Sequence, residues 1–240
     1  MELWADILGP GANNAVPAAI NVGTMNEVNA DAISVANPTW HGTPWEGSSG
    51  LAGALIGDQS MNPPAQIRIG KMNFSIPDIP SPLPTGNGID LVGTLYHEMG
   101  HALGISSLAL VGEDDDGNPV YGFDTEISPW DRHLVDRYGV TPTTDMEVVR
   151  SEPETAPGAD PVFTVGEMTE SGVLFKGTHV SEVLAGALNG GLPIEGFEGD
   201  SLDLSHIELD RSLMSHQDYR NYQDFHGSRT RSASGYRVHD

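Results

Sequence analysis

Residues 89–104 read IDLVGTLYHEMGHALG, and this stretch decides the fold more than any other part of the 240-residue chain. Its apolar residues recur at the three- and four-residue spacing of a helix. They are Leu91, Leu95, Met99, Ala102 and Leu103. Asp90 is a suitable N-cap and Gly104 a suitable C-terminal stop, so the stretch predicts an amphipathic helix with defined ends.

The same helix contains the pattern H-E-x-x-H at residues 97–101. Residues four apart lie on one helix face, so the imidazoles of His97 and His101 can bind one zinc ion. Glu98 follows the first histidine and can reach water at the metal, where a general base is needed. The pattern predicts a catalytic zinc site, and the alternative is a pair of surface histidines beside a solvated glutamate.

The third zinc ligand is the next question, because catalytic zinc usually has three protein ligands. The metzincin pattern H-E-x-x-H-x-x-G-x-x-H would place it at residue 107, which is a serine here. Gly104 does fit that pattern. His206 is the best placed of the other histidines, because Met214 follows it within Ser-Leu-Met-Ser and looks like a Met-turn.

HEMGHALGIS, followed after a long insertion by SHIE and LMS, resembles leishmanolysin and its bacterial relatives, which are metzincin zinc proteases. The resemblance covers roughly residues 60–216. It implies a secreted or cell-surface zinc endopeptidase that acts on protein or peptide substrates. It also implies roles for five residues. His97, His101 and His206 would bind zinc, Glu98 would be the catalytic base, and Met214 would lie beneath the metal.

The composition narrows the classes of function. Lys and Arg number 11 and Asp and Glu number 34, so the net charge is −23, which disfavours nucleic acids and anionic membranes as partners. Cysteine is absent, so disulfides, cysteine-ligated zinc and a thiol nucleophile are excluded. No apolar run is long enough to span a membrane. Residues 1–11 lack the basic start and apolar core of a signal peptide.

The expected fold class is α+β. We expect one catalytic domain over residues 1–226, a monomer, followed by a disordered tail over residues 227–240. The metzincin resemblance implies an N-terminal lobe, about residues 1–104, in which a twisted mixed sheet is backed by the site helix. It implies a smaller, irregular C-terminal lobe over about residues 105–226, with the cleft between the two lobes.

Shorter patterns predict further elements. Alternating apolar residues predict strands within residues 18–27, 30–38, 65–74 and 172–177. We expect the 65–74 strand to form the upper edge of the cleft, where an extended peptide can add to it. Residues 113–122 predict a hairpin turn. Residues 127–139 predict a helix with Ser128 as N-cap and Gly139 at its end.

Three alternatives stay open. Glu182, in a predicted helix over residues 179–188, is the third ligand if the chain belongs to another zincin class. The chain could instead be an extracellular binding module or adhesin with an inactive metzincin fold. Calcium binding at the acidic residues 113–118 is a weak possibility, because they lack the spacing of a twelve-residue calcium loop, and a solvated turn is the simpler interpretation.

Overall fold

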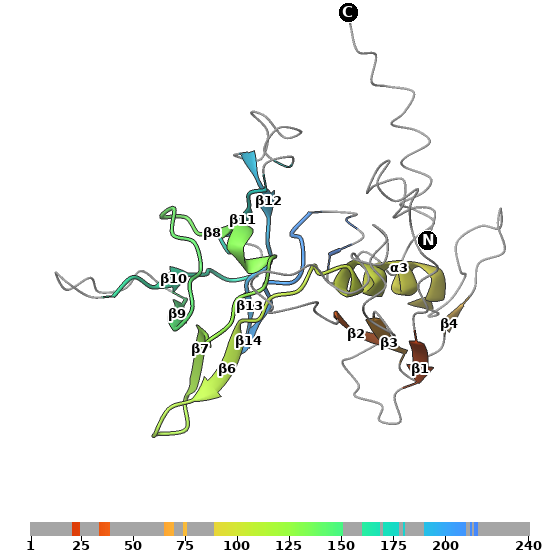
Figure 1. The fold of residues 1–240 in the computed structure, drawn as a ribbon, viewed down its shortest axis with the longest axis horizontal. Helices are drawn as coiled ribbons and strands as arrows, with labels where there is room; N and C mark the ends of the chain where they lie inside the picture. Colours follow the sequence, from red (N-terminus) through yellow and green to blue (C-terminus); the bar gives the residue numbers. More distant parts are fainter. Residues whose placement is uncertain are drawn as a thin grey trace, which may run out of the picture.

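The structure is a computed structural model. It describes residues 21–24, 34–38, 65–69, 74–75, 89–150, 160–168, 170–177, 180, 190–209, 212 and 214–215. The predicted 179–188 helix with Glu182, apart from residue 180, and the predicted tail at 227–240 lie outside these residues. Within them the chain is α+β, as predicted, with many short strands and one α-helix, α3 (Figure 1).

A small mixed sheet forms the N-terminal part of the described chain. Strands β1 (Asn21–Thr24), β3 (Ala65–Ile69) and β2 (Ser34–Pro38) lie in that order, with β3 parallel to β1 and antiparallel to β2. Ile67 is buried and Arg68 exposed, as the alternating pattern predicts. The expectation that this strand is an edge was wrong, because β3 is hydrogen-bonded on both sides and β2 lies at the edge among the described strands.

The helix α3 (Leu91–Ala102) confirms the prediction from the 89–104 stretch. It contacts β2 and β3, and lies beside their sheet in Figure 1. Just before it, β5 (Ile89–Asp90) pairs with β4 (Phe74–Ser75). The helix ends in a Schellman turn, because Ile105 N–H donates to Gly100 O at 3.2 Å and Gly104 N–H to His101 O at 2.9 Å. Gly104 has φ +110°, which a residue with a side chain rarely adopts.

The remaining described chain forms short sheets that follow α3 in sequence. One sheet has the order β10 (Phe163–Thr164), β9 (Met146–Val149), β7 (Pro119–Phe123) and β6 (Leu110–Glu113). A second has the order β12 (Leu192–Pro193), β11 (Leu174–Phe175) and β8 (Leu134–Val135). A hairpin joins β13 (Phe197–Glu198) to β14 (Ser201–Leu202). The strand predicted at 172–177 is therefore present as β11.

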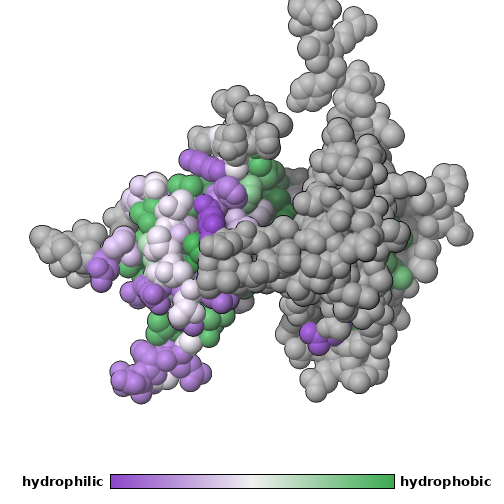
Figure 2. Space-filling view, viewed as in Figure 1, coloured by the Kyte–Doolittle hydropathy of each residue, from purple (hydrophilic) through white to green (hydrophobic). Residues whose placement is uncertain are grey.

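The hairpin predicted over residues 113–122 is confirmed by the pairing of β6 with β7. The Asp114 carboxylate accepts the N–H groups of Asp116 at 2.9 Å and Asn118 at 2.8 Å, which closes the turn. Figure 2 shows a hydrophilic tip and a hydrophobic base on this projecting hairpin. The acidic side chain of Asp114 thus stabilises the turn itself.

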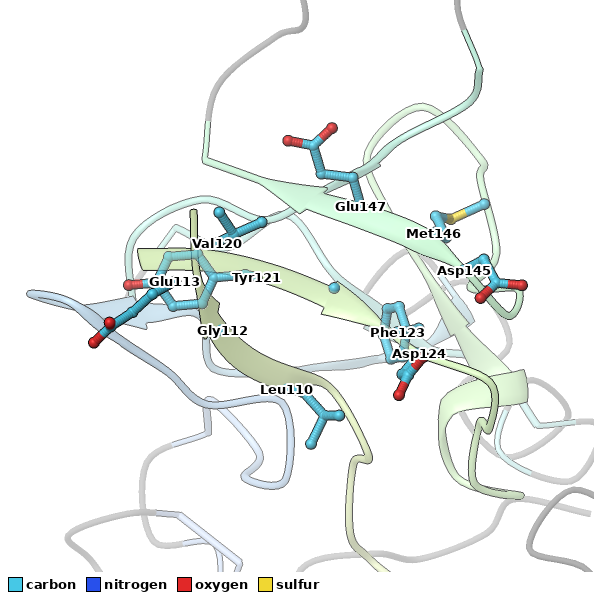
Figure 3. A pocket seen from close by; sticks show the side chains of 11 residues that line it. Leu110, Gly112, Glu113, Val120, Tyr121, Phe123, Asp124, Asp145, Met146 and Glu147 are labelled. Carbon is cyan, nitrogen blue, oxygen red and sulfur yellow. The ribbon is translucent and has the colours of Figure 1, made fainter. Parts of the chain in front are cut away.

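A pocket lies along β6, β7 and β9 (Figure 3). Apolar side chains such as Leu110 and Val120 line it, together with acidic side chains such as Glu113 and Glu147. None of the histidines at 97, 101 or 206 lines it. It is therefore separate from the predicted zinc site.

The helix predicted over residues 127–139 was wrong. The segment forms a single 3-10 turn, η2 (Asp131–His133), and then becomes strand β8, in which Leu134 pairs with Phe175. Ser128 is not the N-cap of this turn, which is Trp130, although its hydroxyl accepts Asp131 N–H at 3.0 Å. Long-range strand pairing and burial of Leu134, which is 0% exposed, override the local helix signal. Gly139, with φ +84°, ends no helix and instead closes a turn through its N–H bond to Asp136 O.

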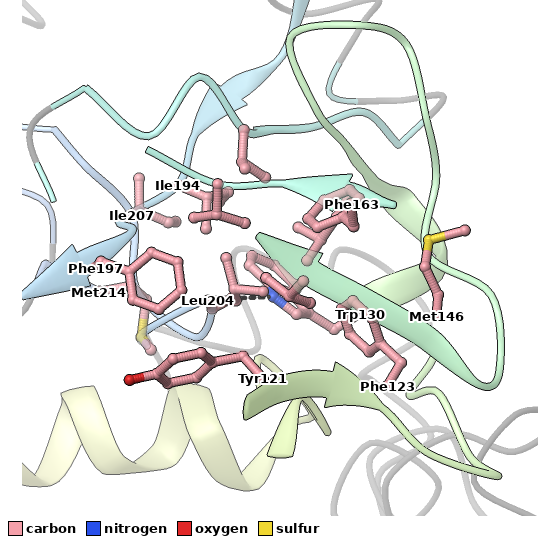
Figure 4. Packing of buried hydrophobic residues seen from close by; sticks show 14 residues of the cluster. Tyr121, Phe123, Trp130, Met146, Phe163, Ile194, Phe197, Leu204, Ile207 and Met214 are labelled. Atoms are coloured by element: carbon pink, nitrogen blue, oxygen red, sulfur yellow. Dashed lines mark hydrogen bonds between the residues drawn. The ribbon is translucent and has the colours of Figure 1, made fainter. Parts of the chain in front are cut away.

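One hydrophobic cluster packs these sheets together (Figure 4). Its aromatic members include Phe123, Trp130, Phe163 and Phe197. The indole N–H of Trp130 donates to Leu204 O at 2.7 Å, so the cluster also ties down the chain two residues before His206. Among the described residues, no helix combines the length and apolar character needed to cross a membrane.

Asp131 connects the segment after α3 to this core. Its side chain is fully buried, and its Oδ2 atom accepts the N–H groups of Leu108 at 2.9 Å and Ser128 at 2.8 Å. Burial raises the pKa of Asp131, which these hydrogen bonds oppose.

We expect Asp131→Ala to lower the free energy of unfolding by about 2–4 kcal/mol, because two buried N–H groups lose their acceptor. Asp131→Asn should cost less, because one amide oxygen can still accept both. Urea denaturation of the two variants measures this, with exposed Asp124→Ala as the control. Equal losses for Ala and Asn would contradict this account of Asp131.

Candidate metal centre

His97 and His101 lie one turn apart on α3, as the pattern predicts. Their Nε2 atoms are 3.1 Å apart, and their rings meet edge to face with centroids 4.7 Å apart. His97 is 3% exposed, so its ring points into the protein and not into solvent. The alternative of two surface histidines is therefore wrong.

The structure brings His206 to the same place. Its Nε2 lies 3.1 Å from that of His97 and 3.2 Å from that of His101. The backbone on both sides is held, because Glu195 N–H donates to His206 O at 3.1 Å and Ile207 N–H to Met214 O at 2.8 Å. Three imidazole nitrogens thus converge, and together they could hold a metal ion.

Ser107 occupies the position at which the shorter metzincin pattern has its third histidine. Its backbone N–H donates to Ser205 Oγ at 3.0 Å, and Ser205 directly precedes His206. The chain just after α3 and the chain just before His206 therefore meet beside the three histidines. Residue 107 supplies a backbone contact there, and His206 supplies the imidazole.

The tautomers of two rings follow from their partners. His101 Nδ1 lies 2.7 Å from Ile105 O, and His206 Nδ1 lies 2.5 Å from Asp203 Oδ2. A carbonyl and an ionised carboxylate only accept, so both Nδ1 atoms carry the proton and both Nε2 atoms present lone pairs. Two lone pairs facing each other at 3.2 Å cannot hydrogen-bond, and a cation between them resolves this.

Protonation of His101 does not resolve it near neutral pH. Burial first, and then repulsion from His206, lower the pKa of His101 from 6.5 to about 4. The ring therefore stays neutral, which is the state that binds a metal ion. The backbone hydrogen bond to Ile105 and the charge of Asp203 oppose this shift.

The donor set fits zinc. Three neutral imidazoles are a known catalytic zinc set, and tetrahedral zinc with nitrogen ligands at about 2.0–2.1 Å places those nitrogens about 3.3 Å apart. The observed separations of 3.1–3.2 Å are close to this. No sulfur ligand is available, because the chain has no cysteine.

Glu98 and Met214, the other two predicted site residues, are both buried. Glu98 is next to His97 on α3 and is 3% exposed. Met214 is 3% exposed within the core cluster, and its N–H donates to Ser212 Oγ at 3.2 Å in a tight turn. The Met214 carbonyl accepts Ile207 N–H, which puts this turn beside the segment that contains His206. The role of Met214 beneath a metal stays a prediction.

Asp203 and Glu195 lie beside His206, and neither was predicted from the sequence. The Asp203 carboxylate bonds to His206, and Glu195 is 5% exposed. The spacing Asp-Leu-Ser-His was the available local signal for Asp203, since Asp side chains often bond to groups two or three residues ahead. Glu195 has no such signal, because it is brought to His206 by a backbone hydrogen bond between two separate segments.

Other groups in the described chain do not form a comparable centre. The two sets of three or more side chains that could hold a metal both contain His206. Neither set includes the acidic residues 113–118, so calcium binding there has no geometric support within the described residues. His133, on η2, is exposed.

Fold and site together define an α+β protein with a three-histidine centre, in which His97 is buried and His101 and His206 are partly buried. No protein-family model matches the chain. Searches of curated proteins and of solved structures also return no significant match. The function is therefore inferred from the geometry of this centre.

Metal binding at this centre should stabilise the fold. At free Zn²⁺ one hundred times the dissociation constant, we expect about 2.7 kcal/mol of added stability, and a chelator should remove it. Thermal melting with Zn²⁺ and with chelator measures this. The effect should disappear in His206→Ala and persist in His133→Ala, whose side chain is exposed. Equal Zn²⁺ stabilisation of both variants would exclude His206 as a ligand.

The metal-free protein should lose stability below neutral pH. Above pH 6.5 His101 is neutral in both states. Between pH 6.5 and about 4, His101 binds a proton in the unfolded chain but not in the folded protein. The free energy of unfolding therefore falls as the pH falls, by at most about 3 kcal/mol. Urea denaturation in chelator at pH 7.5 and 5.0 tests this. His101→Gln should show a smaller pH effect than wild type, and an equal effect would refute it.

Proposed function

We propose that the chain is a zinc-dependent endopeptidase of the metzincin class, similar to leishmanolysin. The observation that carries this proposal is that three imidazole nitrogens converge within 3.2 Å of one another. A buried glutamate, Glu98, lies on the helix that also contains His97 and His101. Structural zinc sites are closed by four protein ligands, whereas three histidines leave a position open for water or substrate. The set therefore favours catalysis over a structural role.

The chemistry divides between metal and protein. A zinc ion held by the three histidines supplies Lewis-acid activation of water and of the substrate carbonyl. Glu98 accepts the proton of the attacking water and delivers a proton to the leaving amine as the peptide bond breaks. Burial of Glu98 excludes competing solvent from this carboxylate. The Nδ1 protons of His101 and His206 are bound by the Ile105 carbonyl and the Asp203 carboxylate, so both rings present their Nε2 atoms to the shared site.

The edge strand β2 offers a surface for an extended substrate. It lies antiparallel to β3, at the sheet edge among the described strands, and it contacts α3. A peptide that adds to such an edge gains main-chain hydrogen bonds, which suits binding of varied protein substrates. In this proposal β2 takes the role that sequence patterns assigned to β3.

The alternatives receive less support. If Glu182 were the third ligand, His206 would not be needed beside His97 and His101. His206 nevertheless lies beside both of them. An inactive binding module would not need Glu98 buried beside His97. Secretion, the monomeric state and the choice of zinc remain part of the proposal.

Glu98→Gln separates catalysis from metal binding. We expect cleavage of a mixed quenched-fluorescent peptide library to fall by about 10²–10⁴-fold, because a neutral amide cannot take the proton. Zn²⁺ binding should persist, since the three histidines are untouched. Glu113→Gln, the same change at an exposed position, is the matched control and should retain full activity.

Two outcomes would contradict the proposal. Activity retained in Glu98→Gln would exclude the assigned base. Tight Zn²⁺ binding by the wild-type protein without cleavage of any library peptide would favour the inactive binding module instead.

A further inference from the structure

We propose that Asp203 is the positioning residue of the metal centre, which keeps the His206 ring in the tautomer and orientation that bind the ion. This inference rests on the proposed metal site and deepens it. Asp203 would not touch the metal or the substrate. Its effect would pass through the imidazole of His206.

The ligands differ in how they are held. His97 and His101 lie on α3, whose backbone fixes their spacing. His206 lies in irregular chain after β14, where no regular element orients its side chain. His101 uses the nearby carbonyl of Ile105 to fix its Nδ1 proton, whereas His206 uses the Asp203 carboxylate. The third ligand therefore depends most on a side-chain anchor.

Both oxygens of Asp203 are committed. Oδ2 accepts the His206 Nδ1 proton at 2.5 Å, and Oδ1 accepts Ser205 N–H at 3.0 Å. The Asp203 N–H donates to Gly196 O at 3.1 Å, which ties its backbone to the neighbouring strand. The Ser205 N–H thus fixes the carboxylate and the Gly196 carbonyl fixes the Asp203 backbone, while the carboxylate holds the ring. A charged acceptor also makes this bond stronger than a neutral one.

Glu195 adds a second carboxylate behind the ring. Its side chain is 5% exposed, and its oxygen lies within 4.8 Å of the ligand atoms of Asp203 and His206. Glu195, Asp203 and His206 could themselves hold an ion by distance alone. The short bond between His206 and Asp203 instead places a proton on Nδ1. The two carboxylates therefore favour a ring that donates through Nδ1 and binds cations through Nε2.

Asparagine at position 203 tests this anchor sharply. Its amide has one acceptor and one donor end, so it cannot accept both Ser205 N–H and His206 Nδ1–H. If the NH₂ group faces His206, it favours the tautomer with the proton on Nε2, which blocks metal binding. If the NH₂ group faces Ser205, that backbone bond is lost and the remaining bond to His206 is uncharged.

The experiment measures Co²⁺ and Zn²⁺ affinity of the full chain by competition with a chromophoric chelator. We expect Asp203→Asn to bind 10–100-fold more weakly, which is the usual cost of losing such an anchor. Its Co²⁺ absorption bands should shift, because the third nitrogen is displaced. Asp200→Asn is the matched control, since it removes the same charge from the same hairpin at a side chain that is 91% exposed. Its affinity and spectrum should be unchanged.

A second measurement needs no variant. Nitrogen-15 NMR of the metal-free wild-type protein at pH 7.5 reports which ring nitrogen of His206 has the proton. We expect Nδ1. A proton on Nε2 would overturn the inference, whether or not Asp203→Asn folds.

The outcomes separate the two proposals. If wild type binds Co²⁺ and Asp203→Asn binds it equally well, the positioning role fails and the proposed metal site stands. If Asp200→Asn weakens binding as much as Asp203→Asn, general charge explains the effect and the positioning role fails. If wild type binds neither ion, both proposals fail.

Discussion

Three imidazole nitrogens must meet within 3.2 Å, and the rest of the described structure can be understood as the means of satisfying this constraint. At least two of them present lone pairs, which repel at this distance unless a cation lies between them. One helix solves the problem for His97 and His101 through local spacing alone. His206 is 105 residues from His101, so its approach must be secured by long-range contacts.

The core provides those contacts on both sides of His206. Leu204 and Ile207 are buried, and Met214 packs in the same cluster. Each buried side chain of this kind contributes about 1.5–3 kcal/mol to the free energy of unfolding. The three together exceed the loss of at most about 3 kcal/mol that the lowered pKa of His101 causes in acid. The protein can therefore hold its histidines together before any ion binds. Hydrogen bonds such as Trp130 to Leu204 then fix the register of the chain.

Sequence patterns predicted the elements that depend on contacts between near neighbours in the chain better than those that depend on long-range contacts. The α3 helix, its paired histidines and the 113–122 turn depend on neighbours a few residues away, and all were predicted. The segment 127–139 had equally good local helix signals, but pairing of Leu134 with Phe175 made it a strand. His206 was expected from its spacing to Met214 and from the family resemblance. Asp203 was missed although its spacing to His206 is local, and Glu195 was missed because a contact between separate segments leaves no periodic trace.

The contact between the two ends of the segment explains how about one hundred residues can separate His101 from His206. The chain leaves α3 through a turn at Gly104 and reaches Ser107, whose N–H binds Ser205, one residue before His206. The two ends of the 108–204 segment therefore lie close together, and its described residues pack into the one hydrophobic cluster that also includes Leu204. Loop-closure entropy rises only slowly with length, so a longer insertion costs little once it folds as a unit. The site then requires only that both ends of that unit stay in place, which is why the contacts of Ser107, Asp131 and Leu204 matter as much as the ligands.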